Sequence, residues 1–180
     1  MYKRQESEDD YELTFAVNYL SHFLLTSLLL PLLKGSAPAR VVNVASASQS
    51  PIDFDDPMLE RGYDAMRAYS TSKLAQIMFT FELAERLSDT GVSVNALHPA
   101  SLMDTKMVQD SFGYTMSTVE EGSEAVVRLT VSSELEGVTG RYFDGKREAH
   151  ADGQAYDEEA RQTLWELSEQ YCGRMREEPF

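Results

Sequence analysis

Hydrophobic residues along the chain alternate between the spacing of a helix and the unbroken run of a buried strand. Residues 11–33 are mostly apolar and include "FLLTSLLLPLL" (Phe23–Leu33), and Gly35 and Pro38 follow them, so we predict a helix that ends there. The next run, "ARVVNVAS" (39–46), is rich in β-branched residues and lacks polar alternation, which predicts a strand covered on both faces. A buried strand after an apolar helix is typical of α/β folds.

The same alternation continues toward the C-terminus. Apolar residues recur at helical spacing over residues 65–88, which predicts a long helix. "VSVNAL" (92–97) follows as a second buried strand. Thr118 and Glu121 form the capping-box pattern at the start of a helix that we expect to reach about Thr130.

A short strand in "GRYFDG" (140–145) and an amphipathic helix (156–171) complete the predicted elements, with loops over 47–64 and 99–117. The order helix, strand, helix, strand, helix, strand predicts an α/β fold in which right-handed crossovers join parallel strands. No repeat, low-complexity tract or linker divides the chain, so residues 1–180 are expected to belong to one domain.

Candidate acid–base residues follow the first predicted strand, and ligands of such sheets bind just beyond the carboxyl ends of strands. Ser46 ends this strand, and Tyr69 and Lys73 in "AYSTSKLAQ" lie at the start of the next helix. Residues four apart are neighbours on a helix, and a nearby ammonium lowers the pKa of a phenol from its usual value of about 10. Such a phenol can exchange a proton with a substrate oxygen that a serine holds, which suits alcohol–carbonyl interconversion with a hydride carrier. This spacing alone leaves open the alternative of a surface pair.

Composition narrows the possible partners. The chain has 16 basic and 30 acidic residues and a formal net charge of -14, which makes nucleic acid an unfavourable partner. Its only cysteine, Cys172, excludes an internal disulfide, and no Cys/His cluster has zinc spacing, so no metal is expected. The start "MYKRQESEDD" lacks the apolar core of a signal peptide, and Phe23–Leu33 is shorter than a membrane span and contains Pro31. We therefore expect a cytoplasmic protein in which Phe23–Leu33 is a buried helix.

Five stretches occur in an order and at a spacing that are typical of one protein family. They are "FAVNYLSHFLLTSLLLPLL", "RVVNVAS", "AYSTSKLAQIMFTFELAERL", "VSVNALHPA" and "GRYFDG". In them the chain resembles the C-terminal part of the short-chain dehydrogenase/reductase family, in its retinol-dehydrogenase-like or carbonyl-reductase-like branch. The Tyr-x-x-x-Lys spacing is a weak signal alone, but it gains weight beside a strand that ends in serine and a downstream Pro turn.

The resemblance implies roles for seven residues. Tyr69 would be the catalytic acid/base, Lys73 would lower its pKa and hold the nicotinamide ribose, and Ser46 would orient the substrate oxygen. Asn18 would hold a water that links Lys73 to solvent. The nicotinamide side of an NAD(P) cofactor would lie against the residues of the Pro turn, which are Pro99, Ala100 and Ser101.

Some positions carry alternatives or depart from the family pattern. Asn18 has the alternative role of satisfying a backbone carbonyl within its helix. His98 is expected to be positional, with catalysis as the alternative. The family's usual Pro-Gly is Pro99-Ala100 here, and the threonine that commonly touches the cofactor is matched only loosely by Thr105.

The resemblance is incomplete at the N-terminal side. A complete member opens with a strand and a glycine-rich turn that places the cofactor pyrophosphate at a helix N-terminus, and neither this turn nor the family's Asn-Asn-Ala-Gly stretch is found in the sequence. We therefore expect a partial doubly wound Rossmann-type parallel sheet that lacks the N-terminal strands and has the 39–46 strand at its edge. An exposed edge predicts a chain that is marginally stable, aggregates or pairs with another copy.

Two functions from different classes follow. The first is an NAD(P)-dependent short-chain dehydrogenase/reductase that interconverts an alcohol and a carbonyl on a fairly apolar small molecule, with the segments 48–67 and 102–114 shaping the substrate site. The alternative is a catalytically silent remnant or an interaction module. The expected partner is a small-molecule carbonyl or alcohol. Neither binding to nucleic acid nor a membrane span is expected. Formation of a homo-oligomer through the two long helices is left open.

Overall fold

The computed structural model describes residues 3–175, apart from the side chains of residues 107, 111, 174 and 175. Its sheet has the order β1-β2-β3-β4, with bounds β1 (Ala39–Val44), β2 (Val92–His98), β3 (Arg141–Asp144) and β4 (Arg147–Glu148). The first three strands are parallel, as predicted. β4 instead pairs antiparallel with β3, because a two-residue turn that begins at Gly145 (φ 58°) reverses the chain. The three predicted strands are thus parallel, and the antiparallel β4 is an addition that the sequence did not predict.

Helices occupy the predicted positions, with two additions. Their bounds are α1 (Leu13–Phe15), the π-helical turn η1 (Ala16–Leu20), α2 (Ser21–Gly35), α3 (Ala65–Arg86), α4 (Lys106–Phe112), α5 (Val119–Val131) and α6 (Glu158–Met175), with short 3-10 helices η2 (Ser133–Leu135) and η3 (Gly153–Tyr156). Apart from the short 3-10 helices η2 and η3, which were not predicted either, the additions are α4 and the π-helical turn η1 inside the predicted helix of residues 11–33. The short helix α4 lies in a segment that was expected to be irregular, because two turns carry too little periodicity to be recognised.

Side-chain caps explain where the two best-defined helices begin. Asp64 accepts a hydrogen bond from the Arg67 amide at 2.8 Å, which starts α3 just ahead of the predicted acid–base pair. Thr118 and Glu121 form the predicted capping box at the start of α5, where each side chain accepts from the backbone amide of the other residue.

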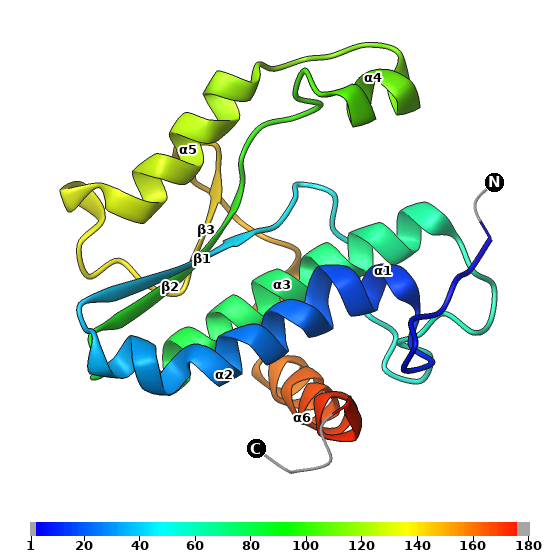
Figure 1. The fold of residues 1–180 in the computed structure, drawn as a ribbon, viewed down its shortest axis with the longest axis horizontal. Coiled ribbons are helices and arrows are strands. Elements are labelled where there is room, and N and C mark those ends of the chain that lie inside the picture. The colour runs from blue at the N-terminus through cyan, green and yellow to red at the C-terminus, as the bar shows by residue number, and fades with distance from the viewer. Residues whose placement is uncertain (1–2, 176–180) are drawn as a thin grey trace.

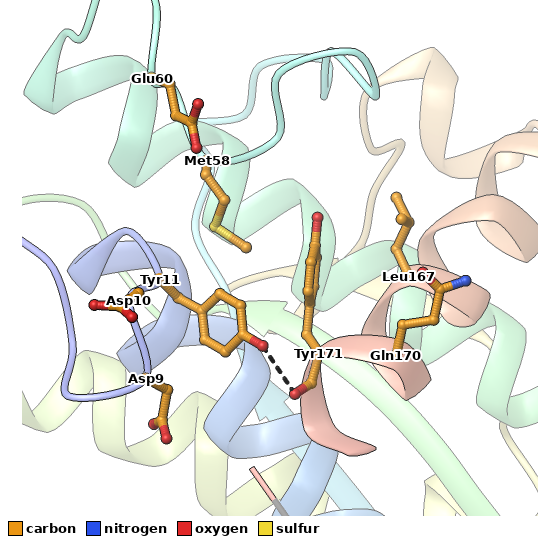
Figure 2. Close-up of a pocket in the computed structure, with 8 residues that line it drawn as sticks. All are labelled: Asp9, Asp10, Tyr11, Met58, Glu60, Leu167, Gln170 and Tyr171. Atoms are coloured by element: carbon orange, nitrogen blue, oxygen red, sulfur yellow. Dashed lines mark hydrogen bonds between the residues drawn. The ribbon is translucent and has the colours of Figure 1, made fainter. Parts of the chain in front are cut away.

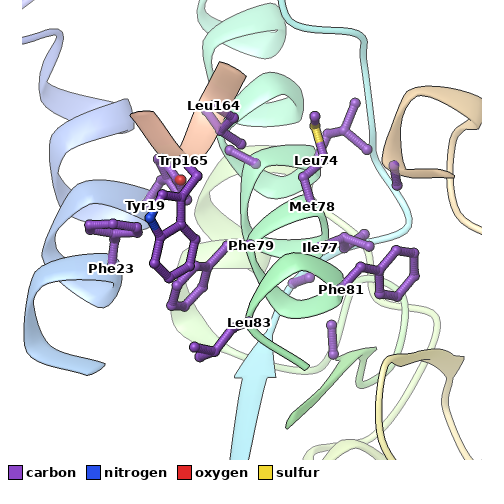
Figure 3. Packing of buried hydrophobic residues seen from close by; sticks show 14 of the residues in the cluster. Tyr19, Phe23, Leu74, Ile77, Met78, Phe79, Phe81, Leu83, Leu164 and Trp165 are labelled. Atoms are coloured by element: carbon purple, nitrogen blue, oxygen red, sulfur yellow. The ribbon is translucent and has the colours of Figure 1, made fainter. Parts of the chain in front are cut away.

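The helices form two layers around the sheet. In Figure 1, α5 lies over one face of the sheet, and α2, α3 and α6 lie on the other side. Four aromatic rings pack together in this second layer, with centroid separations between 5.0 and 6.4 Å; they are Tyr19, Phe23, Phe79 and Trp165 (Figure 3). The cluster joins η1, α2, α3 and α6, and so it holds α3 in place against the sheet.

The outer face of α2 contradicts the prediction that Phe23–Leu33 is a buried helix. Phe23 is 1% exposed, whereas Leu25, Leu28 and Leu32 are 58%, 48% and 65% exposed. The cause lies in the order of the strands. Within residues 3–175 the sheet ends at β1, so no strand lies beyond it to cover this face of the helix.

The helix itself agrees with the one predicted over residues 11–33. It runs without a break from Leu13 to Gly35, past Pro31, and by length and composition it is apolar enough to cross a membrane, with 22% of its most apolar window buried. Core helices of globular proteins reach the same length and composition, so the expectation that the chain has no membrane span stays a prediction. The inner side chains of this helix, Tyr19 and Leu20, are fully buried against the rest of the fold, as in the core helix of a globular domain.

Replacing Phe23 should destabilise the chain far more than replacing its exposed neighbour. Phe23→Ala removes a ring that packs against Phe79 and Trp165, and it should lower the free energy of unfolding by about 3–5 kcal/mol. Leu25→Ala changes the outer face of the same helix and should cost no more than about 0.5 kcal/mol. Urea unfolding followed by circular dichroism measures both variants. Equal losses would contradict the division of this helix into a buried and an exposed face.

The position of β1 at a sheet edge is as predicted for the described residues. An edge strand presents unpaired backbone groups to other chains, and here it borders the exposed leucines of α2. We therefore expect a marginally stable chain that aggregates or associates as concentration rises. Sedimentation velocity and thermal melts test this expectation. A monomer that melts reversibly and cooperatively at high temperature would show it to be wrong.

Candidate active site

Lys73 lies between the end of β1 and the Tyr69 ring. Its Nζ donates hydrogen bonds to the carbonyl of Val44, the last residue of β1, at 3.0 Å and to Oε1 of Gln76 at 2.9 Å. The same nitrogen lies 5.7 Å from the ring centroid of Tyr69, one turn earlier on α3. Burial lowers the pKa of Lys73. Tyr69 is 36% exposed, so its phenol is accessible from outside while the ammonium beside it is held by two acceptors.

Ser46 is buried close to this pair, just after β1. Its Oγ accepts a hydrogen bond from the Ser48 amide at 3.1 Å. Ser48 Oγ in turn lies 2.8 Å from Oγ of Ser70, the residue after Tyr69 on α3. These bonds bring the segment that follows β1 against the start of α3. The structure therefore gathers Ser46, Tyr69 and Lys73 at one corner of the sheet.

Two residues that were not predicted hold the backbone at Ser46. The Ser46 carbonyl accepts hydrogen bonds from the Tyr142 hydroxyl at 3.1 Å and from Nε2 of Gln49 at 3.0 Å. Burial, with the nearby Asp144 carboxylate, raises the pKa of Tyr142 to about 12, so this phenol stays protonated and able to donate. Tyr142 lies in the predicted β3 strand, and only the pairing of strands shows that it reaches Ser46.

Asn18 lies in η1 and reaches the corner through another residue that was not predicted. Its Nδ2 donates to Oγ of Ser72 at 3.0 Å, and that hydroxyl donates to the carbonyl of Tyr69 at 2.7 Å. A π-helical turn shifts side chains from their regular helical positions, and such turns are frequent at functional sites. The described contacts join Asn18 to the backbone of Tyr69, and its water-mediated link to Lys73 stays a prediction.

The predicted cofactor-binding residues lie at the end of the neighbouring strand. Pro99, Ala100 and Ser101 follow β2 and line a cavity of about 410 Å³, together with Asp144 at the end of β3. Nε2 of His98 lies 3.0 Å from Oγ of Ser101, which supports the positional role that was expected for His98. None of Ser46, Tyr69 and Lys73 lines this cavity. The cavity and the corner around Tyr69 nevertheless lie at the same edge of the sheet, because the neighbouring strands β1 and β2 are parallel.

Thr105, the loose match to a cofactor-contacting threonine, has a structural task here. Its Oγ1 accepts a hydrogen bond from the Val108 amide at 3.4 Å and caps α4. Within residues 3–175, no group of three or more His, Cys, Asp or Glu side chains is arranged to hold a metal ion. The chemistry available at the corner is thus that of a phenol, an ammonium and a hydroxyl.

Comparison with known proteins defines the class. The family description "short chain dehydrogenase" matches residues 2–113, which is more than half of the chain. The chain therefore belongs to the short-chain dehydrogenase family, and its α/β fold is the Rossmann-like fold of that family in partial form.

Individual relatives are similar over nearly the whole chain. Retinol dehydrogenase 14 from Homo sapiens is 41% identical over 185 residues, which cover 95% of this chain and 55% of that protein. Retinol dehydrogenase 13 from Mus musculus is 40% identical, and the match covers 93% of this chain and 55% of that protein. WW domain-containing oxidoreductase from Homo sapiens is 36% identical, and the match covers 91% of this chain and 44% of that protein. The chain thus spans about half the length of the curated relatives it matches.

Solved structures show the same fold. An uncharacterized protein from Mycobacterium paratuberculosis matches with a TM-score of 0.74 and 27% identity, over 94% of this chain and 62% of that one. An NADPH-bound carbonyl reductase from chicken fatty liver matches with a TM-score of 0.59 over 84% of this chain and 60% of that one. At 22% identity this second likeness supports the fold alone.

Stability should fall as the pH drops through the usual pKa of histidine, near 6.5. Burial lowers the pKa of His98, with a weaker opposing effect from Asp144, so the unfolded chain binds this proton more readily than the folded one. His98→Asn should therefore reduce the loss of stability between about pH 7.5 and pH 5.5. Burial also lowers the pKa of His22. Because His22 is still present in the variant, it accounts for part of the loss of stability that remains. Urea unfolding at both pH values measures the difference, and an unchanged loss in the variant would contradict the assignment.

Proposed function

We propose that this chain carries the catalytic part of an NAD(P)-dependent oxidoreductase that interconverts an alcohol and a carbonyl on a fairly apolar small molecule. The supporting observation is the corner at the carboxyl end of β1, where the Lys73 ammonium lies 5.7 Å from the Tyr69 ring and the bonds around Ser48 bring Ser46 close by. Membership of the short-chain dehydrogenase family agrees with this chemistry. Residues 1–180 would form the C-terminal catalytic part of a single Rossmann-type domain.

In this proposal Tyr69 is the general acid/base. Its hydroxyl gives a proton to the alkoxide oxygen when a carbonyl is reduced, and takes the proton back when an alcohol is oxidised. The ammonium of Lys73 lies 5.7 Å from the centroid of the Tyr69 ring, one turn along the same helix. Ser46 Oγ accepts its hydrogen bond from the Ser48 amide, so its own hydrogen is available to a substrate oxygen. Asn18, held by Ser72, would place the water through which the proton reaches solvent.

The residues present fit the nicotinamide end of an NAD(P) cofactor. The cavity lined by Pro99, Ala100 and Ser101 lies at the end of β2, next to the strand whose end Lys73 contacts. Lys73 and these three residues would hold the nicotinamide and its ribose. When bound, the cofactor supplies or accepts the hydride. The protein's own part is to position the substrate oxygen and to move the proton.

An apolar substrate agrees with the segments expected to shape its site. Phe112 and Tyr114, in and after α4, are exposed, and they belong to the segment 102–114 that follows the Pro turn. The segment 48–67 would form the opposite wall. Two relatives are named for retinol, an apolar alcohol, which agrees with this substrate class.

A cytoplasmic location is part of the proposal. It is supported by the inner face of the helix Leu13–Gly35, where Tyr19, Leu20 and Phe23 pack into the core as in a globular domain. The exposed leucines on the other face make this a point to test. Cell fractionation tests whether the protein is cytoplasmic or bound to a membrane. Recovery only in the membrane fraction would contradict the proposal.

Replacing Tyr69 should abolish most of the turnover. A chimera that joins the N-terminal part of human retinol dehydrogenase 14 to this chain supplies the part of that relative that the chain does not match. In the chimera, Tyr69→Phe should lower kcat by about 10²–10⁴-fold, since it removes the proton donor. Tyr156→Phe, which changes an exposed tyrosine of η3 that is not one of the proposed catalytic groups, is the matched control and should leave kcat unchanged. Undiminished turnover in Tyr69→Phe would overturn the proposed mechanism.

The chain alone should bind NADPH and NADH weakly or not at all. Residues 3–175 contain no glycine-rich turn that leads from a strand into a helix, and this is the feature that holds the cofactor pyrophosphate in such folds. Isothermal titration calorimetry with each cofactor measures the affinity. Micromolar binding would show that the described residues hold the cofactor without that turn.

The second candidate is a catalytically silent interaction module, and the exposed apolar face of α2 favours it. Leu25, Leu28, Leu29 and Leu32 lie on this face, next to the edge strand β1. The two candidates differ in what the chimera does. Turnover that depends on Tyr69 supports the enzyme, whereas a folded chimera without turnover supports the interaction module.

A further inference from the structure

A cavity of about 600 Å³ shares no residue with the proposed catalytic and cofactor-binding groups, although Met58 and Glu60 belong to the segment 48–67 that would wall the substrate site. Three segments that are far apart in the sequence line it: residues 9–11 before α1, residues 58–60 in the loop before α3, and residues 167–171 near the end of α6 (Figure 2). Its volume lies within the range of small-molecule sites, roughly 300–1,000 Å³.

Direct contacts join the three segments. The Tyr11 hydroxyl donates to the carbonyl of Tyr171 at 3.1 Å, and the two rings lie 5.0 Å apart between centroids at a tilt of 56° (Figure 2). Nε of Arg4 donates to the carbonyl of Met58 at 3.0 Å, which ties the N-terminal segment to the loop. The walls are thus connected before any ligand binds, which reduces the entropy that binding would cost.

The backbone beside the cavity is held in uncommon conformations. Asp10 and Leu59 have φ values of 65° and 50°, in the left-handed region that residues other than glycine rarely adopt. The carboxylate of Asp56 accepts hydrogen bonds from the amides of Glu60 at 2.8 Å and Arg61 at 3.0 Å, and these bonds fix Glu60 at the rim. Conformations of this kind occur at ligand-binding sites more often than elsewhere.

The lining combines an aromatic interior with a negatively charged rim. Tyr11 and Met58 are almost fully buried. In Figure 2 the Tyr171 ring lies between these two side chains and those of Leu167 and Gln170. The rim carries three exposed carboxylates, which are Asp9, Asp10 and Glu60. Among the described residues that line this cavity, none is a lysine or an arginine.

Two described arginines near the cavity, Arg4 and Arg61, have acidic partners of their own. Arg4, whose Nε is bonded to the loop, forms an ion pair with Glu6 through Nη1. The guanidinium of Arg61 lies 3.7 Å from the Asp56 carboxylate. Among the described residues, the rim carboxylates therefore place negative charge over an apolar, aromatic interior.

We infer that this cavity binds a small organic cation, in which an ammonium group is carried on an apolar body. Aromatic faces attract cations through the ring quadrupole, and carboxylates around a partly enclosed site add a direct attraction. The ammonium of Lys73 would repel the same ligand from the proposed active site, so the two sites take different molecules. The inference does not rest on the proposed function, because none of the proposed catalytic and cofactor-binding residues lines this cavity.

The test compares a charged probe with its neutral match. Choline is the probe, and 3,3-dimethylbutan-1-ol, in which carbon replaces the charged nitrogen, is the match. Each is titrated into the 180-residue chain and followed by NMR at the Met58 methyl group, assigned through Met58→Leu. Choline should give a saturable shift that the neutral alcohol does not give. Equal shifts with both, or no saturable shift with choline, would overturn the inference. The same titration of the chimera decides the matter if the chain itself associates.

Matched variants locate the binding. The double variant Asp10→Asn with Glu60→Gln keeps side-chain size, and asparagine tolerates the left-handed backbone at position 10. It should weaken choline binding by about tenfold, as should Tyr171→Leu, while circular dichroism stays unchanged. Glu120→Gln removes an exposed carboxylate of α5 outside the cavity, and should leave binding within about twofold. Equal weakening by this control would show that choline is attracted to the acidic surface in general. It would contradict the assignment of choline binding to this cavity.

Discussion

The hydrogen bond from the Lys73 ammonium to the Val44 carbonyl is the contact on which the proposed site depends. A partly buried cation is costly unless polar groups surround it, and the end of β1 and the Gln76 amide supply them at 3.0 and 2.9 Å. The strand end thereby sets where the ammonium lies, and the helix sets where Tyr69 lies relative to it. A shift of α3 along the sheet would break the bond to Val44 and move Tyr69 and Lys73 together relative to the end of β1.

Packing far from the corner keeps that bond in place. The aromatic cluster of Tyr19, Phe23, Phe79 and Trp165 joins α3 to α2 and α6, and the Asp64 cap defines where α3 begins. On the other side of the corner, β3 reaches across the sheet, since the Tyr142 hydroxyl holds the Ser46 carbonyl. The proposed catalytic groups are thus oriented by residues that take no part in the chemistry, which is how rigid scaffolds hold exposed reactive groups.

The sequence predicted much of the fold because its elements carry strong local signals. The long helix of 65–88, the buried strands of 39–46 and 92–97 and the capping box at Thr118 are all present within a few residues of their expected bounds. The sequence failed where local signals are weak or where burial depends on neighbours. The two-turn helix α4 and the two-residue strand β4 are too short to show a period, and the exposure of Leu25 and Leu32 depends on which strands lie beside β1.

The sequence by itself determined the spacing of Tyr69 and Lys73, since residues four apart on any helix share a face. It also placed Ser46 after a strand and Pro99 after another, because both follow clear β-branched runs. Only the tertiary structure decided that Ser72 mediates the contact of Asn18, that Tyr142 supports Ser46, and that three distant segments enclose a second cavity. Side chains that meet across strands and helices depend on register and packing between elements, and no local pattern in a single chain records these.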